Sequence, residues 1–347
     1  MYHDDPLWGP IALDEPVVAA LVRSGPVQRL RGIAQAGASA YLYPERASIT
    51  RFDHSLGVMH VLAALRATLE EQVAGLLHDV PHTAFSHTVD IAFPSAEYNF
   101  HEEFHRRIVL DSELPQILTS HAIPVETVIE PERFPLLEQP LPLICADRVD
   151  YTLRDRHASG RLSSREAQAY LARLIPTPEG ILHPDVDSAL WFARHFVEAN
   201  HTSWTGPDEA GAYWALGNAV KRAVSLGILR LQQLFLTDQE VMERLRSSAD
   251  PEISGYLQLL EPGTRFFAVT TDGPYFDTHM KQRVVDPLVL QSGTSVPQPL
   301  SHFSPSYARL LAGIPPLGTL TYRLWSDKMP AILAQIYGDM SLRRGAR

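Results

Sequence analysis

Two histidines and two aspartates from three separate stretches of the chain could bind one divalent metal ion. They are His54, the adjacent pair His78 and Asp79, and Asp147. Imidazole nitrogens suit first-row transition ions, and carboxylate oxygens suit harder ions such as Mg and Mn. A mixed set of this kind leaves coordination positions open for water and substrate. These residues therefore predict a site for a divalent ion, with Mn, Mg or another first-row transition ion as the cofactor.

The local sequence places these ligands on helices. Apolar residues follow His54 at the spacing of one helix face. His78 and Asp79 close a short apolar helix, and successive side chains on a helix point about 100° apart, so both could reach one ion. Asp147 begins a further helical stretch. A second His-Asp pair near the N-terminus has no such surroundings, so the pair alone does not establish a metal site.

Further histidines could move protons near this site. His82 lies four residues after His78 and would share its helix face if the helix continued past Pro81. His87 and Asp90 are three residues apart, so the carboxylate could orient the imidazole and make it more basic. A histidine is often an ordinary surface or core residue, and each of these positions keeps that alternative.

Arginine is concentrated around the predicted site although the chain is acidic. The net charge is −10, yet residues 23–52 carry five Arg against one Glu and residues 145–165 carry five Arg against three Asp. Guanidinium groups bind phosphate oxygens bidentately. Arg51, three positions before His54, could balance phosphoryl charge, unless it forms an ordinary salt bridge. The pattern predicts a small anionic substrate and argues against nucleic acid as the main partner.

The segments that carry these residues resemble the HD-domain phosphohydrolases, and they occur in the same order. The matching segments are residues 5–13, 28–37, 43–44, 51–57, 77–87 and 147–155. Within that superfamily the chain is most similar to the deoxynucleoside triphosphate triphosphohydrolases. The resemblance covers about residues 5–235, and it implies a metal-dependent enzyme that acts on nucleotides and forms homo-oligomers.

The resemblance also implies roles for individual residues. Four match positions that contact phosphate or protonate the leaving oxygen: His82, His87, Asp90 and His101. Six would contact the substrate: Gln35, Arg51, Tyr151, Asp155, Asn200 and His201. Tyr151 and Asp155 share a helix stripe with Asp147 and Asp150, which would place them against the sugar. A helix-end glutamine, and a core tyrosine with a capping carboxylate, are the alternatives.

Two positions depart from the pattern of these enzymes. Pro81 stands where they usually have glycine, and Ala199 stands where the triphosphohydrolases tend to have an aromatic residue. The first departure affects the backbone after the His-Asp pair, and the second would widen or alter the nucleoside pocket. Both favour the alternative of a phosphatase or pyrophosphatase for another small phosphorylated metabolite.

The expected fold class is mainly α. We expect an HD-domain helical bundle over residues 1–235 and a small C-terminal α+β appendage over residues 236–347, packed on it. Residues 11–36 are predicted to be helical with a break at residue 24, and residues 38–50 to form a loop or short hairpin. Strands are expected at residues 265–271 and 282–290, and a helix at residues 326–340.

Composition and termini indicate a cytoplasmic protein without a membrane span. The chain has 347 residues, 45% of them hydrophobic, which is enough for a large core. It has one cysteine and no leader pattern or long apolar run. We predict hydrolysis of a deoxynucleoside triphosphate to deoxynucleoside and triphosphate. The alternatives are the phosphatase named above and a regulator that senses nucleotides without turnover.

Overall fold

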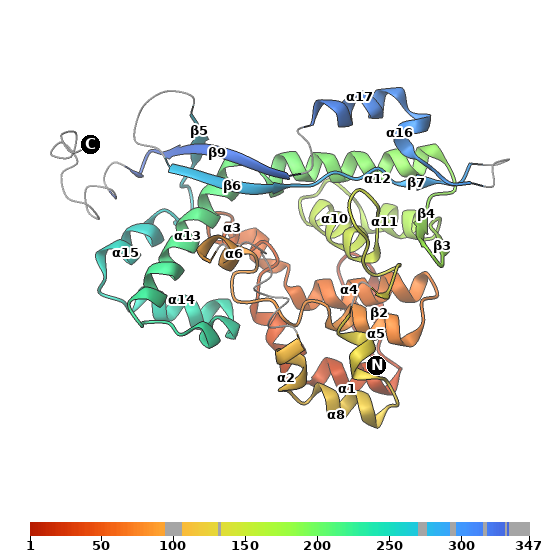
Figure 1. The fold of residues 1–347 in the computed structure, drawn as a ribbon, viewed down its shortest axis with the longest axis horizontal. Coiled ribbons are helices and arrows are strands. Elements are labelled where there is room, and N and C mark those ends of the chain that lie inside the picture. Colours follow the sequence, from red (N-terminus) through yellow and green to blue (C-terminus); the bar gives the residue numbers. More distant parts are fainter. Residues whose placement is uncertain are drawn as a thin grey trace.

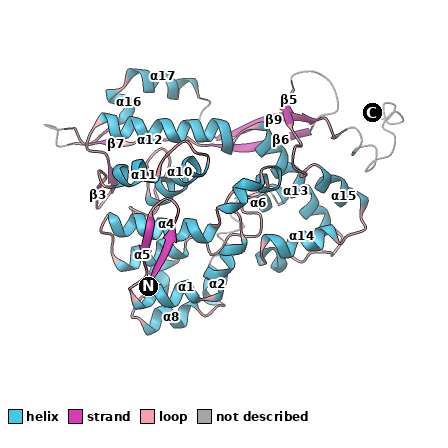
Figure 2. Ribbon diagram, turned by 180° about the vertical axis from the view of Figure 1, so that it is seen from behind, coloured by secondary structure: helices cyan, strands magenta, loops and turns pink. Residues whose placement is uncertain are grey.

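The computed structural model describes residues 1–93, 106–130, 133–269, 276–291, 296–314, 318–329 and 332, and it is mainly helical (Figure 1). The prediction of a mainly α fold with small sheets is confirmed. Seen from behind, the strands form a hairpin near the N-terminus and a band along one edge, and helices make up the rest of the described chain (Figure 2).

The N-terminal segment begins with a hairpin that the sequence analysis did not predict. Strands β1 (Tyr2–Asp5) and β2 (Gly9–Ala12) pair antiparallel. Short helical segments follow: α1 (Pro16–Arg23), α2 (Gly25–Arg29), η1 (Leu30–Gly32), α3 (Ser39–Leu42) and η2 (Pro44–Ser48). The helical prediction for residues 11–36 is therefore wrong at its start and at residues 33–36, which are not helical, and residues 38–50 form helical turns rather than a hairpin. The predicted break is present, because Ser24 separates α1 from α2.

The central helices position the predicted metal ligands: His54 and Asp147 lie within helices, whereas His78 and Asp79 follow a helix that ends at Leu77 rather than closing it as predicted. The central helices are α4 (Arg51–Ala64), α5 (Leu69–Leu77), α6 (Thr88–Ala92), α8 (Leu114–Ser120), α9 (Val125–Val128) and α10 (Ala146–Ala158). Helix α4 packs against both α5 and α10. Its start is fixed by a capping box, in which the Thr50 side chain accepts from the Asp53 amide and Asp53 accepts from the Thr50 amide.

Further helical segments follow α10. They are α11 (Ser164–Leu171), α12 (Val186–Ala199), the π-helical turn η4 (Asn200–Trp204), α13 (Pro207–Ser225), η5 (Leu231–Phe235), α14 (Asp238–Arg246) and α15 (Pro251–Gln258). A small antiparallel hairpin joins α11 to α12; its strands are β3 (Ile175–Thr177) and β4 (Gly180–Leu182).

The C-terminal part is mixed, as expected, and two of its strands lie within the predicted ranges 265–271 and 282–290, although both are shorter than predicted. Its elements are β5 (Phe266–Ala268), β6 (Phe276–Gln282), β7 (Leu288–Val289), β8 (Gln298–Pro299), α16 (Leu300–Phe303), α17 (Pro305–Gly313) and β9 (Gly318–Ser326). Strand β9 lies between β5 and β6 in an antiparallel sheet. The sequence analysis missed β6 and β9. The helix predicted at residues 326–340 falls mostly outside the described residues.

Two groups of buried apolar side chains form the core. One surrounds α4, α5, α10 and α12 and includes side chains from residues 285–314. The other lies around α13, α14 and α15 and reaches the sheet of β5, β9 and β6. The described part of the chain contains no helix with the length and apolar character needed to cross a membrane.

Candidate metal centre

His54 lies at the centre of the predicted ligand set. Its ring is buried on α4, and its Nε2 is 2.9 Å from Oδ1 of Asp147. Its Nδ1 is 2.7 Å from Oδ2 of Asp150. Burial alone would lower the pKa of His54, but the hydrogen bonds to both carboxylates outweigh burial and raise it to about 10. The ring is therefore surrounded by negative charge.

His78 presents one ring nitrogen to the same place. Its Nδ1–H donates to the Gly75 carbonyl at 2.7 Å, which leaves Nε2 as the acceptor nitrogen. That Nε2 is buried and has no hydrogen-bond partner among the described residues. It lies 3.5 Å from Asp79 Oδ1 and 3.6 Å from Asp147 Oδ1. A buried nitrogen with a lone pair, facing two carboxylates beyond hydrogen-bond distance, fits a cation between them.

The donor geometry fits a divalent ion. One ligand atom each from His54, His78 and Asp79 lie within 4.8 Å of one another, and Asp147 contacts both imidazoles. Burial would raise the pKa of Asp79, but the charges of Arg51 and His78 hold it well below its usual range. Burial would likewise raise the pKa of Asp147, but His54 and His78 lower it, and the pKa is lowered on balance. Both carboxylates are therefore ionised and available to a metal.

Asp150 holds His54 in place and is itself tightly bound. Its Oδ1 accepts from the Trp8 indole at 2.6 Å, and the Arg154 guanidinium donates to both of its oxygens at 2.8 and 2.9 Å. Arg154 also pairs with Asp5 at 2.8 Å, which ties the N-terminal hairpin to α10. A side chain at Gly57 would collide with this network, because a Cβ there would lie 2.0 Å from Asp150 Oδ1. The contact of Asp150 with His54 was not predicted.

Arg51 connects the cluster to the loop after α5. It donates to Asp79 Oδ2 at 2.7 Å and, through Nε, to Ser86 Oγ at 2.8 Å. Ser86 donates in turn to the Ala34 carbonyl at 2.8 Å. Arg51 is buried beside the metal ligands, as its spacing from His54 predicted, and the salt bridge named as the alternative is formed with one of those ligands.

The loop that carries Ser86 is held by a residue far along the chain. Phe85 and Ser86 both have positive φ, at 62° and 55°, which is a strained backbone for non-glycine residues. Asp238 at the start of α14 accepts from the Phe85 amide at 2.7 Å and from the Ala34 amide at 2.9 Å. The two carboxylate oxygens of Asp238 therefore hold the backbone on both sides of the hydrogen bond between Ser86 and Ala34.

The predicted acid-base residues gather beside the cluster. His82 Nε2 is 3.3 Å from Asp79 Oδ1, and helix α5 ends at Leu77, so the helix does not continue past Pro81 to place His82 on the face of His78. His87 Nδ1 lies 3.3 Å from Asp90 Oδ2, and the rings of His82 and His87 are 5.0 Å apart. Burial lowers the pKa of His87, and Asp90 opposes this effect. His101 lies outside the described residues.

The residues predicted to contact a nucleoside are only partly brought together. The Tyr151 ring lies 6.4 Å from that of His54 and 5.2 Å from that of Trp204. Asp155 accepts from the Trp204 indole at 2.6 Å, and burial raises the pKa of Asp155 while this bond opposes the shift. Trp204 was not predicted as part of the site, although it ends a π-helical turn, a feature that is common at functional sites.

The three remaining substrate candidates differ in their surroundings. The Oε1 atom of Gln35 is buried and has no hydrogen-bond partner in the described part of the chain. Asn200 is 1% exposed, and its Oδ1 likewise lacks a partner among the described residues. His201 is exposed, and within the described residues it has no hydrogen bond or ring contact with the His-Asp cluster.

A second group of possible metal ligands lies next to the first, but an arginine side chain already pairs with it. Glu138, Cys145 and Asp147 could place one donor atom each within 4.8 Å of one another. The Arg148 guanidinium lies 2.9 Å from Cys145 Sγ and 3.2 Å from Glu138 Oε1. Burial and the Glu138 charge raise the pKa of the Cys145 thiol. This group therefore has the character of an ion pair with a protonated thiol rather than of a metal site.

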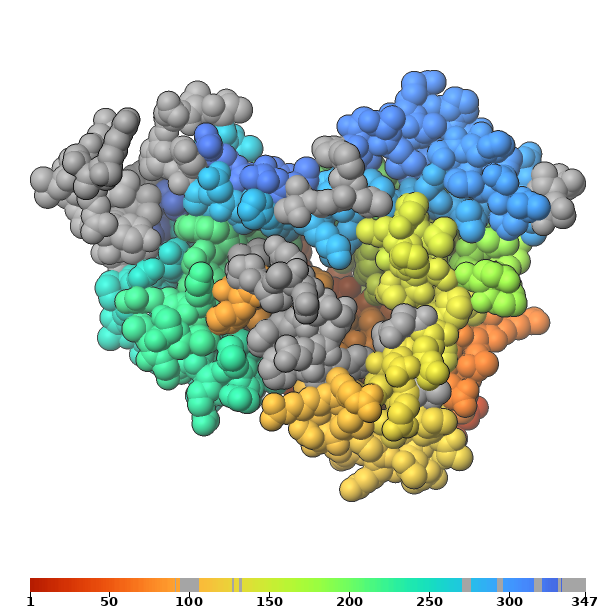
Figure 3. All heavy atoms as spheres, in the orientation of Figure 1, coloured from red at the N-terminus to blue at the C-terminus, as the bar shows by residue number. Residues whose placement is uncertain are grey.

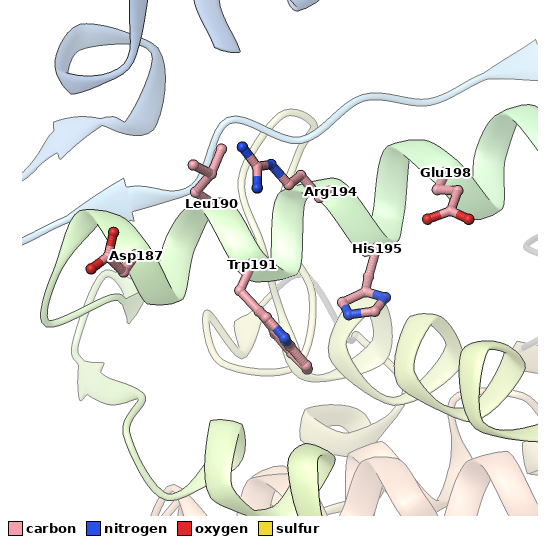
Figure 4. Close-up of a pocket in the computed structure, with 6 residues that line it drawn as sticks. All are labelled: Asp187, Leu190, Trp191, Arg194, His195 and Glu198. Atoms are coloured by element: carbon pink, nitrogen blue, oxygen red, sulfur yellow. The ribbon is translucent and has the colours of Figure 1, made fainter. Parts of the chain in front are cut away.

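A shallow hollow of about 390 Å³ lies along α12 and is separate from the cluster. Figure 4 shows its six lining residues, all on that helix, with Trp191 and His195 on one side of it and Leu190 and Arg194 on another. None of the predicted site residues lines it. His195 accepts from Arg156 at 3.2 Å, so its ring serves a contact between α12 and α10.

Comparison with known proteins identifies the family. Residues 51–155 match the HD domain. Over 311 residues the chain is 33% identical to the metal-dependent phosphohydrolase cns2 of Cordyceps militaris. The aligned residues make up 87% of this chain and 89% of that protein. The chain belongs to the HD-domain family of metal-dependent phosphohydrolases. The predicted class of enzyme and its divalent metal cofactor are confirmed.

Other proteins match over different lengths. The uncharacterized protein YdhJ of Bacillus subtilis is 39% identical over 277 residues, 79% of this chain and 84% of that protein. A hypothetical protein of Aquifex aeolicus has the same fold, with a TM-score of 0.73, 20% identity and coverage of 99% and 100% of the two chains. The deoxynucleoside triphosphate triphosphohydrolase SAMHD1 of Xenopus laevis is 37% identical over 105 residues, which are 26% of this chain and 16% of that protein.

Proposed function

We propose that this HD-domain phosphohydrolase hydrolyses nucleotides, and that its substrate is a deoxynucleoside triphosphate cleaved to deoxynucleoside and triphosphate. The observation that carries the proposal is the arrangement along α10. Asp147 contacts the metal-ligand histidines, and the Tyr151 ring one turn later lies 6.4 Å from His54. An aromatic face beside a metal centre suits a sugar next to the phosphoryl group that reacts. The partial similarity to SAMHD1 supports the same substrate.

We assign the metal to His54, His78, Asp79 and Asp147. A divalent ion held there is a Lewis acid that polarises a phosphoryl group and makes water more acidic. Asp150 and the Gly75 carbonyl orient the two imidazoles so that each turns Nε2 inward. Arg51, fixed between Asp79 and Ser86, supplies positive charge to a phosphoryl oxygen.

The proton for the leaving oxygen is assigned to His87. Asp90 binds its Nδ1, which directs Nε2 away from that carboxylate. Burial lowers the pKa of both His82 and His87, so the choice between them rests on their carboxylate partners: His82 faces Asp79, which is assigned to the metal, whereas His87 faces Asp90, which is not. His101, by resemblance, belongs to the same group.

A phosphatase or pyrophosphatase of a smaller phosphorylated metabolite is the second candidate. It is favoured by the Trp204 indole, which already bonds to the Asp155 carboxylate at 2.6 Å. By resemblance Asp155 would instead accept from a sugar hydroxyl. Ala199, in place of an aromatic residue, points in the same direction because it changes the expected sugar contact.

Analysis of the reaction products tests both candidates. Purified protein with Mn is incubated with a panel of deoxynucleoside triphosphates, nucleoside triphosphates and monophosphates, with His78→Ala protein as the control. We expect inorganic triphosphate and deoxynucleoside, both absent with His78→Ala. Orthophosphate or pyrophosphate as the released product would reject the triphosphohydrolase and favour the second candidate. Full metal content and activity in Asp147→Ala protein would falsify the ligand assignment.

A further inference from the structure

The C-terminal part of the chain contributes two cations, Lys281 and Arg283, that form no ion pair among the described residues, although the charges of Asp90 and Glu138 act on Lys281. Lys281 lies near the end of β6, and Arg283 lies in the segment that follows it. Arg283 is half-buried. Neither side chain forms an ion pair or hydrogen bond within the part of the chain that the structure describes. A partly buried guanidinium without an ion-pair partner has lost water contacts, and no protein contact has replaced them. An anionic ligand would therefore stabilise it.

The backbone next to Arg283 is firmly anchored. The Asp286 amide donates to the Pro142 carbonyl at 2.8 Å, in the stretch that leads into α10. The Tyr307 hydroxyl donates to the Val285 carbonyl at 2.5 Å, and Val285 is fully buried. These contacts hold the segment against the helix that carries Asp147, so the position of Arg283 relative to the site is set by the fold.

Electrostatic effects locate the Arg283 charge beside the site. Burial raises the pKa of Tyr151, and the positive charge of Arg283 opposes this rise. The same charge adds to burial in lowering the pKa of His87. Burial lowers the pKa of Lys281, and Arg283 and Arg148 lower it further. Such effects weaken with distance, and the Arg283 charge acts on residues of both α10 and the loop after α5.

The surface view is consistent with this position. Figure 3 shows a hollow near the middle of the face, with light blue atoms of β6 and the segment after it along its upper border and yellow atoms of the stretch before α10 beside it. Two other arginines near the cluster are paired with carboxylates, Arg51 with Asp79 and Arg148 with Glu138, and Arg29 donates to the Val80 and His82 carbonyls.

We infer that Arg283, with Lys281 beside it, binds the phosphoryl groups of a polyphosphate substrate that lie beyond the one at the His-Asp cluster. The C-terminal segment thereby takes part in substrate binding. This inference rests on the proposed function, because it assumes an anionic phosphorylated substrate, and it narrows the substrate to one with at least two linked phosphoryl groups. The planar guanidinium fork matches phosphoryl oxygens in pairs, whereas Lys281 offers a point charge.

Binding of inorganic anions to the metal-loaded protein tests this inference. The probes are inorganic triphosphate and orthophosphate, measured by titration calorimetry on wild type, Arg283→Ala, Arg283→Lys and Arg309→Ala. Arg309 is an exposed arginine on α17 and serves as the matched loss of charge. We expect Arg283→Ala to weaken triphosphate at least tenfold and orthophosphate less than threefold. Arg283→Lys should fall between, and Arg309→Ala should match wild type.

Three outcomes would overturn the inference. One is triphosphate binding by Arg283→Ala that equals wild type, and another is no triphosphate binding by wild type at millimolar concentration. The third is an equal loss for both anions, which would place Arg283 at the reacting phosphoryl group or make its effect nonspecific. Thermal melting of each variant checks the fold. Failure of the proposed function is a separate result, because it is read from the products of the wild-type enzyme.

Discussion

The two imidazoles of the metal centre are oriented by different groups. His78 donates to a backbone carbonyl, whereas His54 donates to the carboxylate of Asp150, which also binds Trp8 and Arg154. A carboxylate behind a ligand histidine fixes its tautomer and makes it a stronger ligand. Asp150 is thus a positioning residue whose effect on the metal passes through His54.

Asp150→Asn should therefore weaken metal binding without removing a ligand. We expect the dissociation constant for Mn to rise about 10- to 100-fold, because the His54 imidazole loses its anionic partner. Activity should recover at high Mn concentration. Metal titration and activity at two metal concentrations measure this, and Asp187→Asn on the exposed face of α12 is the control. Unchanged Mn affinity would show that Asp150 serves only the fold.

At the scale of elements, α14 controls the loop that holds Arg51. Asp238 binds the amides of Phe85 and Ala34 with separate oxygens, on either side of the Ser86 contact. Burial raises the pKa of Asp238 to about 6, and the two amide bonds oppose the rise. An element more than 150 residues away in sequence therefore positions a residue of the site.

Asp238 should make stability depend on pH. A carboxyl with a pKa of about 6 when folded and near 3.8 when unfolded favours the folded state while it is protonated. The free energy of unfolding of wild type, relative to Asp238→Asn, should therefore fall as pH rises from about 4 through about 6 and then stay level. We expect a change of about 1–2 kcal/mol, because the residue is partly exposed.

Urea denaturation of both proteins between pH 4 and 7.5 measures this difference. An Asp187→Asn variant, which changes an exposed carboxylate, should run parallel to wild type over the whole range. A constant difference between wild type and Asp238→Asn would show that Asp238 does not titrate in this window.

At the scale of the whole molecule, the chain shares its cores between early and late segments. Val285, Val289, Leu300 and Tyr307 belong to the same buried group as α4, α5 and α10. The sheet of β5, β9 and β6 covers α13 through a second group. The proposed division at residues 235 and 236 stays a prediction, and this packing suggests how to test it.

Val285→Ala should destabilise the molecule as one unit. Removing a fully buried side chain from the shared core should lower the free energy of unfolding by about 2 kcal/mol. Because the core is shared, tryptophan fluorescence and far-UV circular dichroism should report the same single transition. Leu310→Ala, at an exposed position on α17, should have little effect. Two transitions, only one of them shifted, would indicate that residues 236–347 unfold independently.

The sequence by itself predicted the candidate metal ligands and the helices around them, and the resemblance of its motifs predicted the class of enzyme. His54, His78, Asp79 and Asp147 could be recognised because the ligand types are chemically restricted and each lies in a locally coded element. Helix α4 has its capping box and α5 its apolar face. Arg51 and the pair of His87 with Asp90 were found in the same way, since their spacing along the chain is short.

Only the tertiary structure decided which distant residues support those ligands. Asp150, Asp238 and Trp204 act through contacts between elements, and neither helical periodicity nor local spacing reports which elements meet. Strand β9 was missed for the same reason, because strand formation depends on the partners that β5 and β6 provide. The placement of Arg283 beside residues of α10 likewise follows from packing around residues 285–287. Long-range packing determines the surroundings of a site whose ligands local chemistry had already identified.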